Sequence, residues 1–186
     1  MKGEKLRQQD FSKKEKSNPL LPLMILFVIL LLDLLSKKWV VQNLPLSGPY
    51  FWMFPFGGIP VFQCLGIDCC IHYVSNYGAA WGLGSHFQTQ IVILRFIIVF
   101  FLLKSLYTSS KLPKYYIPLA LIAAGGVGNI LDYFLYGHVV DMIHLIFWGY
   151  SYPVFNVADA AIVIGVMWIA VLQIQSSRKY DISSSK

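Results

Sequence analysis

The sequence predicts an all-α membrane protein: a bundle of four transmembrane helices that carries a small strand-containing platform and a short interfacial helix outside the cytoplasm. Composition is the first observation, because 56% of the 186 residues are hydrophobic and only 13% are charged, a balance that soluble domains of this length rarely have. The second is the presence of four apolar segments near the roughly 20 residues that cross a bilayer as a helix. These segments are 20–41, 90–107, 115–135 and 157–173.

The positions of the basic residues predict the orientation in the membrane. Lys and Arg precede the first apolar segment, lie around the connection between the second and third, and follow the fourth, whereas the two other connections contain none. Since cytoplasmic loops carry an excess of Lys and Arg, both termini are expected in the cytoplasm and those two connections outside it. Anionic lipid head groups explain the net charge of +6, and nucleic acid is not expected as a partner.

These features predict one membrane domain with a polar tail at each end. Residues 1–18 are polar, rich in Lys and without apolar periodicity, so we expect a disordered basic cytoplasmic tail. Residues 19–175 form the membrane domain, and 176–186 form a second cytoplasmic tail. Within the domain, 44–88 is expected to form the platform, and 136–156 an interfacial segment anchored by its aromatic residues.

The first apolar segment carries an acid and a base one helical turn apart. Asp33 and Lys37 are four residues apart and therefore share a helix face. One interpretation is a local ion pair in which Lys37 extends its amine to the membrane interface. The other is that Asp33 also holds a neighbouring loop or helix in place. The sequence leaves both open.

Segment 44–88 is rich in proline, glycine and β-branched or aromatic residues, which disfavours a long helix. Ile59–Cys64 and 70–75 are its best strand candidates. At its end, Asn76 and Gly78 begin a run of small residues around one amide, which would let backbone approach a ligand. Composition by itself favours a plain loop that returns to the membrane.

Three cysteines and four histidines do not have the spacing of a metal site. Cys64, Cys69 and Cys70 lack C-x-x-C spacing, and the histidines lack His-x-x-x-His spacing, so the sequence predicts neither a zinc site nor a thioredoxin-type centre. A structural role for the cysteines is favoured. A disulfide between Cys64 and one of the adjacent pair is the alternative in an oxidising compartment.

Polar residues gather near the predicted outer ends of the last two helices. Asn129 and Asp132 are three residues apart on one helix face. Asn156 and Asp159 repeat this spacing at the start of the fourth helix, and Asp141 lies between the two pairs. Because carboxylates and carboxamides near hydrocarbon are costly, they usually mark function.

Acids this close cannot all be ionised at low cost, so one carboxyl is expected to stay protonated beside an ionised partner. The ionised member can take a proton from water, while the protonated one polarises an amide carbonyl and helps the amine leave. We predict that Asp141 and Asp159 are this catalytic pair, with Asn129 and Asn156 orienting the carboxylates or the substrate backbone. Two classes stay open: an intramembrane aspartic hydrolase and a proton-coupled small membrane carrier that uses buried Asp and Asn.

Five blocks carry a family resemblance. They are DLLSK at 33–37, NYGAAWG at 76–82, GGVGNILD at 125–132, GHVVD at 137–141 and FNVAD at 155–159. In type and order they resemble those of signal peptidase II, the bacterial lipoprotein signal peptidase family. The resemblance covers the chain except for the tails and the middle of the outer loop.

This resemblance implies a multi-pass aspartic endopeptidase of the bacterial cytoplasmic (inner) membrane, with its active site near the outer face. Such enzymes remove the signal peptide of prolipoproteins just before a cysteine that carries diacylglycerol. The resemblance also implies contact with membrane lipids, inhibition by globomycin-type cyclic peptides, and no metal or cofactor. It implies catalysis by Asp141 and Asp159, and substrate-binding or supporting roles for Asp33, Lys37, Asn76, Gly78, Asn129, Asp132 and Asn156.

This chain differs from the family pattern at one position where the family carries a positive charge. The family usually has Arg directly after the acid that corresponds to Asp132, whereas this chain has Tyr133. A tyrosine donates one hydrogen bond but brings no positive charge. Arg95, in the second helix, is a candidate to supply that charge.

Overall fold

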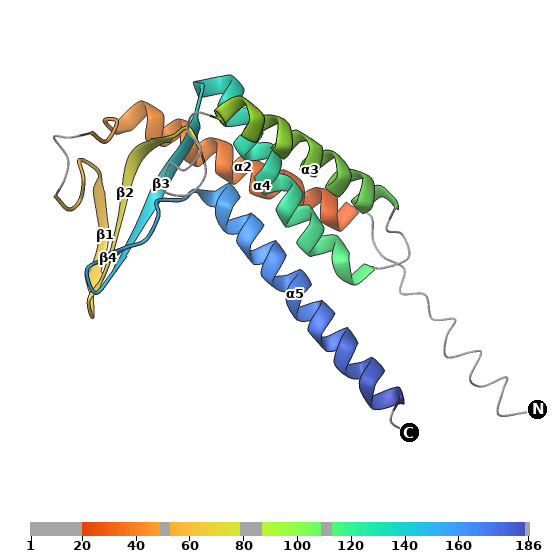
Figure 1. The fold of residues 1–186 in the computed structure, drawn as a ribbon. Coiled ribbons are helices and arrows are strands. Elements are labelled where there is room, and N and C mark those ends of the chain that lie inside the picture. Colours follow the sequence, from red (N-terminus) through yellow and green to blue (C-terminus); the bar gives the residue numbers. More distant parts are fainter. Residues whose placement is uncertain (1–19, 49–52, 79–86, 109–112, 185–186) are drawn as a thin grey trace, which may run out of the picture.

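A computed structural model describes residues 20–48, 53–78, 87–108 and 113–184, and the predicted tail 1–18 lies outside these ranges. Its long helices are α2 (Leu20–Asn43), α3 (Gln88–Thr108), α4 (Tyr116–Tyr136) and α5 (Val157–Ser184). All four are long and apolar enough to cross a membrane, so the predicted four-helix architecture is confirmed. Figure 1 shows a small sheet at one end of these helices.

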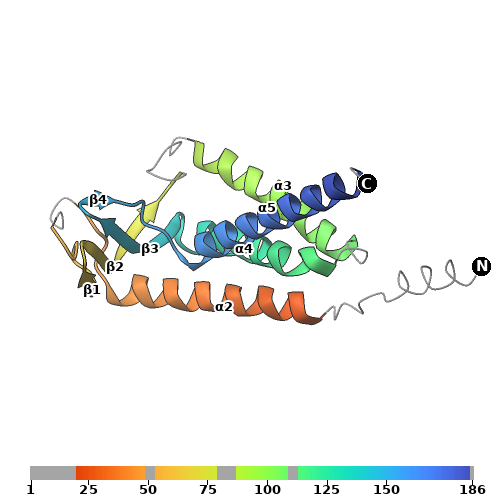
Figure 2. The same ribbon diagram turned by 90° about the horizontal axis from the view of Figure 1, so that it is seen from below.

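Helix α4 is the centre of the bundle, since it packs against α2, α3 and α5 (Figure 2). Small residues allow this close packing, as they do at many helix contacts in membranes. A Cβ atom at Gly125 would lie 2.3 Å from the carbonyl oxygen of Ala158 in α5. One at Gly128 would lie 2.5 Å from Oδ2 of Asp33 in α2. Both glycines therefore bring the helix ends that carry acids into contact.

The outward sides of the helices are apolar. Large hydrophobic side chains are exposed along α2, α3 and α5, and examples are Phe27, Phe100 and Trp168. Exposed apolar surface of this extent is expected where a helix faces lipid rather than water. The bundle thus buries polar groups inside and presents hydrocarbon outside.

The sheet has four antiparallel strands in the order β1 (Ile59–Cys64), β2 (Ile67–Asn76), β3 (Val139–Phe147) and β4 (Tyr150–Ser151). The strands expected in segment 44–88 are confirmed, and the bounds of β1 match the prediction. The other half of the sheet comes from the segment for which we expected only interfacial anchoring. Residues 137–156 contain no helix, so the expected interfacial helix does not lie there.

Local sequence explains why this second segment forms a hairpin. Helix α4 ends at Gly137, whose φ of 75° is the left-handed conformation of a helix C-cap, and its N–H donates to Tyr133 O. β-Branched residues follow in β3, and the turn to β4 has positive φ at Trp148 and Gly149, 47° and 85°.

The cysteines of the sheet form no disulfide. Cys64, Cys69 and Cys70 are all free thiols, the first exposed and the other two buried. The alternative of a Cys64 disulfide is therefore not realised in this structure.

Candidate active site

Asp159 is held at the first turn of α5 by reciprocal capping. The side-chain oxygen of Asn156 accepts a hydrogen bond of 2.8 Å from the Asp159 N–H, and Asp159 Oδ2 accepts one of 3.4 Å from the Asn156 N–H. This arrangement satisfies two of the free N–H groups at the helix start. It also fixes the direction of the Asp159 carboxylate.

Two carboxamides connect Asp159 with Asp141 on β3. Asn156 Nδ2 donates to Asp141 Oδ1 at 2.8 Å and to Asn129 Oδ1 at 3.2 Å. Asn129 Nδ2 in turn donates to Asp159 Oδ1 at 2.8 Å. The two acids predicted as a pair, 18 positions apart in the chain, therefore share one network.

The other oxygen of Asp141 is bound by the last residue of β2. Asn76 Nδ2 donates to Asp141 Oδ2 at 2.9 Å, and Asn76 Oδ1 accepts from the Gly78 N–H at 2.9 Å. Arg95 Nη2 donates to the Gly78 carbonyl at 3.4 Å. Asn76 and Gly78 thus lie at the site as predicted, while the rest of their block, residues 79–82, lies outside the described ranges.

Lys37 is the hub of a second, fully buried group of polar side chains. Its Nζ lies 2.6 Å from Asp33 Oδ2, 2.7 Å from Asp132 Oδ2 and 3.2 Å from Asn129 Oδ1. The interpretation in which Lys37 extends to the interface is therefore wrong. Two carboxylates hold its amine inside because a buried charge needs opposite charges and hydrogen bonds around it.

The acids of this group position backbone. Asp33 Oδ1 accepts a hydrogen bond of 2.9 Å from the Ala158 N–H, so the interpretation in which Asp33 holds a neighbouring helix is confirmed. Asp132 Oδ2 accepts one of 3.2 Å from the Val140 N–H, directly before Asp141. Each acid therefore anchors the residue next to one member of the predicted pair.

The carboxyl group of Asp141 is in a position that favours its protonated form. The residue is 2% exposed. Burial, and then the negative charge of Asp159, raise the pKa of Asp141 from 3.8 to about 7, although hydrogen bonds from Asn76 and Asn156 oppose the shift. Near neutral pH this carboxyl can therefore carry a proton beside a charged neighbour.

Both acids line one cavity of about 600 Å³. Asn76 and Arg95 contribute polar groups to its wall. Its apolar lining includes Val139, Leu145, Phe147, Phe155, Val163 and Ile164. A second cavity of about 450 Å³ reaches Asp141 from the side of β2. Such an apolar pocket with a few converging polar groups is typical of a ligand or active site.

Ser36, which lies in the block DLLSK, and Tyr133 lie apart from this chemistry. Ser36 donates its hydroxyl to the Asp33 carbonyl at 2.9 Å and has no nucleophile geometry. Tyr133 packs edge-on against Phe134 and does not line either cavity. The positive charge at the larger cavity comes from Arg95 instead.

Fold and site together define a four-span membrane protein with two carboxyl groups at an apolar cavity beneath a sheet. The family described as "Signal peptidase (SPase) II" matches residues 25–175, and the chain belongs to this family. It is therefore a membrane peptidase, and the proton-coupled carrier hypothesis is not favoured.

Similar proteins agree with this assignment. The "Lipoprotein signal peptidase" of Wigglesworthia glossinidia brevipalpis is 32% identical over 157 residues, 83% of this chain and 91% of that protein. The protein of the same name from Syntrophus aciditrophicus (strain SB) is 32% identical over 161 residues, 82% of this chain and 91% of that protein.

Solved structures of a "bacterial membrane enzyme" share the fold. One has a TM-score of 0.67 at 25% identity and covers 84% of this chain and 88% of its own. Another has a TM-score of 0.65 at 26% identity and covers 82% of this chain and 91% of its own.

Proposed function

We propose that this protein is an aspartic endopeptidase in which Asp141 and Asp159 cleave the signal peptide of prolipoproteins. One observation carries the proposal: both carboxyl groups line the same cavity and are linked through Asn129 and Asn156. Membership of the signal peptidase II family supports the reaction, and the names of the two relatives support lipoproteins as substrates.

In the proposed reaction Asp159 is the general base and Asp141 the general acid. Asp159 removes a proton from water, whose oxygen bonds to the carbonyl carbon of the scissile peptide. Asp141, whose pKa is raised to about 7, donates its proton toward the carbonyl oxygen, which stabilises the tetrahedral intermediate. The carbon–nitrogen bond then breaks as Asp159 passes the water proton to the leaving amine, and the hydroxyl of the intermediate returns its proton to Asp141.

The other predicted site residues act as positioning groups in this proposal. Asn76 and Asn156 orient Asp141, the Gly78 N–H holds the Asn76 side chain, and Asn129 orients Asp159. Asp33, Lys37 and Asp132 hold the backbone on either side of the pair. Together with the four spans they make up the peptidase domain, 19–175.

The substrate that fits this site brings its own apolar groups. We propose prolipoproteins whose cysteine carries diacylglycerol, with cleavage just before that cysteine. The apolar walls of the larger cavity can receive hydrocarbon, and the lipid-facing surface lets the substrate approach within the membrane. Globomycin-type cyclic peptides are expected to compete for the same cavity.

The proposed location is the bacterial cytoplasmic membrane, with the sheet and cavity at the outer side. The distribution of Lys and Arg supports this orientation, because the connections that form the sheet contain none. Both termini are then cytoplasmic.

A cleavage assay with purified protein and a diacylglyceryl-modified precursor tests the proposal. Asp141→Asn and Asp159→Asn should each lower turnover by about 10²–10⁴-fold, because each removes one half of the acid–base pair. The matched control is Asp68→Asn. This acid lies on β2, in the same sheet as Asp141, but lines neither cavity. Wild-type turnover by either pair variant would reject the assignment.

A further inference from the structure

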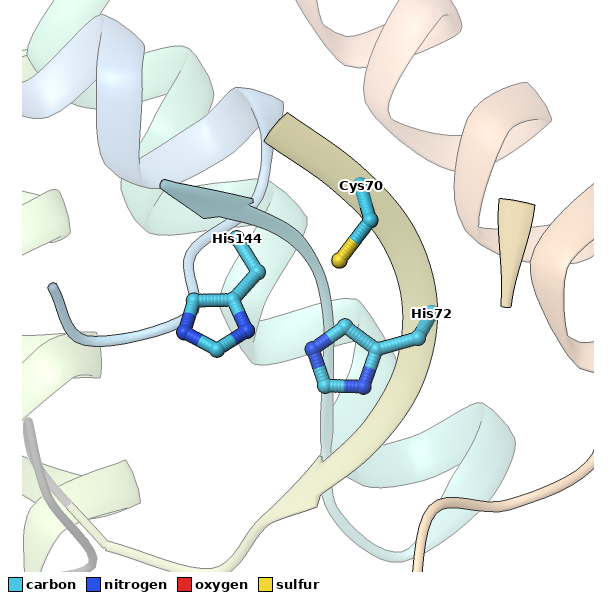
Figure 3. A group of neighbouring side chains, drawn as sticks. All are labelled: Cys70, His72 and His144. Atoms are coloured by element: carbon cyan, nitrogen blue, oxygen red, sulfur yellow. The ribbon is translucent and has the colours of Figure 1, made fainter. Parts of the chain in front are cut away.

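A second group of chemically active side chains lies on the sheet and is not used in the proposed cleavage. Cys70 and His72 are on β2, two residues apart and thus on the same face, and His144 on β3 is the register partner of Cys70. Figure 3 shows Cys70 and His72 projecting toward the His144 ring. One ligand atom from each of the three lies within 4.8 Å of the others, and all three residues are buried.

Each imidazole has one nitrogen bound and one without a partner. His72 Nδ1 lies 2.7 Å from Ser47 Oγ, and His144 Nε2 lies 2.8 Å from Ser151 Oγ. His72 Nε2 and His144 Nδ1 have no hydrogen-bond partner among the described residues, although these side chains are only 4% and 5% exposed. Buried nitrogens without a partner are rare and call for an explanation.

An aromatic ring covers both imidazoles. The ring of Phe56 packs over them, with centroids 5.2 Å from His72 and 4.9 Å from His144. Metal ions bind neutral imidazole, and the opposite nitrogen of such a ligand usually carries an orienting hydrogen bond.

We propose that Cys70, His72 and His144 bind one thiophilic transition-metal ion, Zn²⁺ or Cu⁺, as a structural site within the sheet. One thiolate and two imidazoles are ligands that such ions accept. Bonds of about 2.3 Å to sulfur and 2.0–2.1 Å to nitrogen need the ligand atoms somewhat closer than they lie here, which rotation of the side chains can provide. The Cys70 thiol loses its proton to solvent as the metal–sulfur bond forms.

The site would join β2 and β3, the two strands that hold Asp141 in position. β2 continues to Asn76, which donates to Asp141, and β3 carries Asp141 itself. A metal held between Cys70 and His144 would resist separation of these strands. The inference rests on the sheet alone and is independent of the acid pair, because the expected effect is on binding and stability.

Metal titration of the full-length protein in detergent, after removal of metal with a chelator, tests the proposal. Co²⁺ is the spectroscopic probe for Zn²⁺, and Cu⁺ is titrated separately against a chromogenic chelator. We expect one equivalent of Zn²⁺ or Cu⁺ to bind and to raise the Tm. A Co²⁺ complex should show sulfur-to-metal charge-transfer absorption.

Variants identify the ligands. Cys70→Ser and His144→Asn should each weaken binding by about 100-fold or more, and Cys70→Ser should abolish the charge-transfer band. Cys64→Ser is the matched control, since it removes an exposed thiol of the neighbouring strand and should leave binding unchanged.

X-ray absorption of the wild-type complex gives a result that does not depend on variant folding. One sulfur and two imidazole neighbours around the metal would support the proposal. Absence of stoichiometric binding by the wild type, a shell without sulfur, or unchanged binding in folded Cys70→Ser would overturn it.

Discussion

Four buried or half-buried acids meet at this site, and their partners divide them into two pairs. Asp33 and Asp132 each form an ion pair with Lys37. Among the described residues, Asp141 and Asp159 accept hydrogen bonds from amides, which orient a carboxylate but do not cancel its charge. A proton on one carboxyl group therefore relieves the repulsion between Asp141 and Asp159. The charges of Asp33 and Asp132 are instead balanced by the cation of Lys37.

The raised pKa of Asp141 predicts a pH-dependent stability. Since the folded pKa of about 7 exceeds the ordinary value of 3.8, the folded protein holds this proton more tightly than the unfolded chain. The resulting stabilisation is complete below about pH 4 and is lost as the pH rises through about 7. Asp141→Asn removes this dependence, so its Tm relative to wild type should rise between about pH 5 and pH 8.

Thermal unfolding in detergent across this pH range measures the effect. Asp68→Asn serves as the control, because this acid lies outside both cavities. A constant Tm difference between Asp141→Asn and wild type would contradict the raised pKa.

Arg95 is predicted to take the place of the charge that the family usually has next to Asp132. It lines the cavity with both acids and donates to the Gly78 carbonyl, whereas Tyr133 does not reach the cavity. Arg95→Ala should lower kcat/KM by about 10-fold or more through loss of positioning. Arg95→Lys should recover part of the loss, and Tyr133→Phe should change little. Near-normal cleavage by Arg95→Ala would count against this role.

At the scale of elements, the contact between α4 and α5 determines where the pair lies. Gly125 allows the backbone of α4 to approach Ala158, and Asp33 accepts the Ala158 N–H from the other side. The next residue is Asp159. The small residues of α4 therefore control the position of one acid through helix packing and not through direct contact.

Gly125→Ala should shift α5 and weaken both stability and cleavage. Alanine is favoured over glycine in a helix by about 0.5–1 kcal/mol, but the new Cβ would lie 2.3 Å from a backbone oxygen that cannot rotate away. Overpacking of this kind costs about 1–3 kcal/mol, so the clash should win. Thermal unfolding and cleavage rates check this. Gly48→Ala, which meets nothing within 4 Å, should match wild type.

At the scale of the whole molecule, a buried group of polar side chains lies within helices whose outward sides are apolar, and the sheet lies at one end of the helices (Figure 1). The cavity that reaches the acids has apolar walls, and the helices around it expose hydrocarbon to the membrane. In the proposed function, the lipid chains of the substrate would follow this apolar surface to the acid pair.

Lipid modification of the substrate should control the rate. An unmodified precursor should be cut with a kcat/KM about 100-fold or more below that of its diacylglyceryl form, because it loses the binding energy of the lipid chains. Paired assays in the same detergent measure the ratio. Equal rates for the two precursors would argue against diacylglycerol recognition.

The four spans, and the helix faces on which the polar residues lie, were predictable because they depend on local patterns. Apolar length identifies a span, and the spacing of Asn129 with Asp132 and of Asn156 with Asp159 puts each pair on one helix face. The spacing in Asp33 and Lys37 likewise predicted their ion pair, but not the third partner, Asp132, since it comes from another helix.

The sheet shows where prediction from local patterns ends. Strand β3 was expected only as an interfacial segment, because its aromatic and β-branched residues suit both a membrane interface and a strand. The grouping of Cys70, His72 and His144 follows from the pairing of β2 with β3, and spacing rules along one chain do not detect it.

By itself, the sequence determined that this chain enters the membrane four times and carries costly acids near the ends of its helices. The free energy of moving a side chain from water to hydrocarbon depends on its residue type, and the helical period decides which residues share a face. Only the tertiary structure decided which acid faces a cation and which faces another acid. The physical reason is that charge balance depends on distances between elements, and these are set by how closely α4 packs and by how β2 and β3 align.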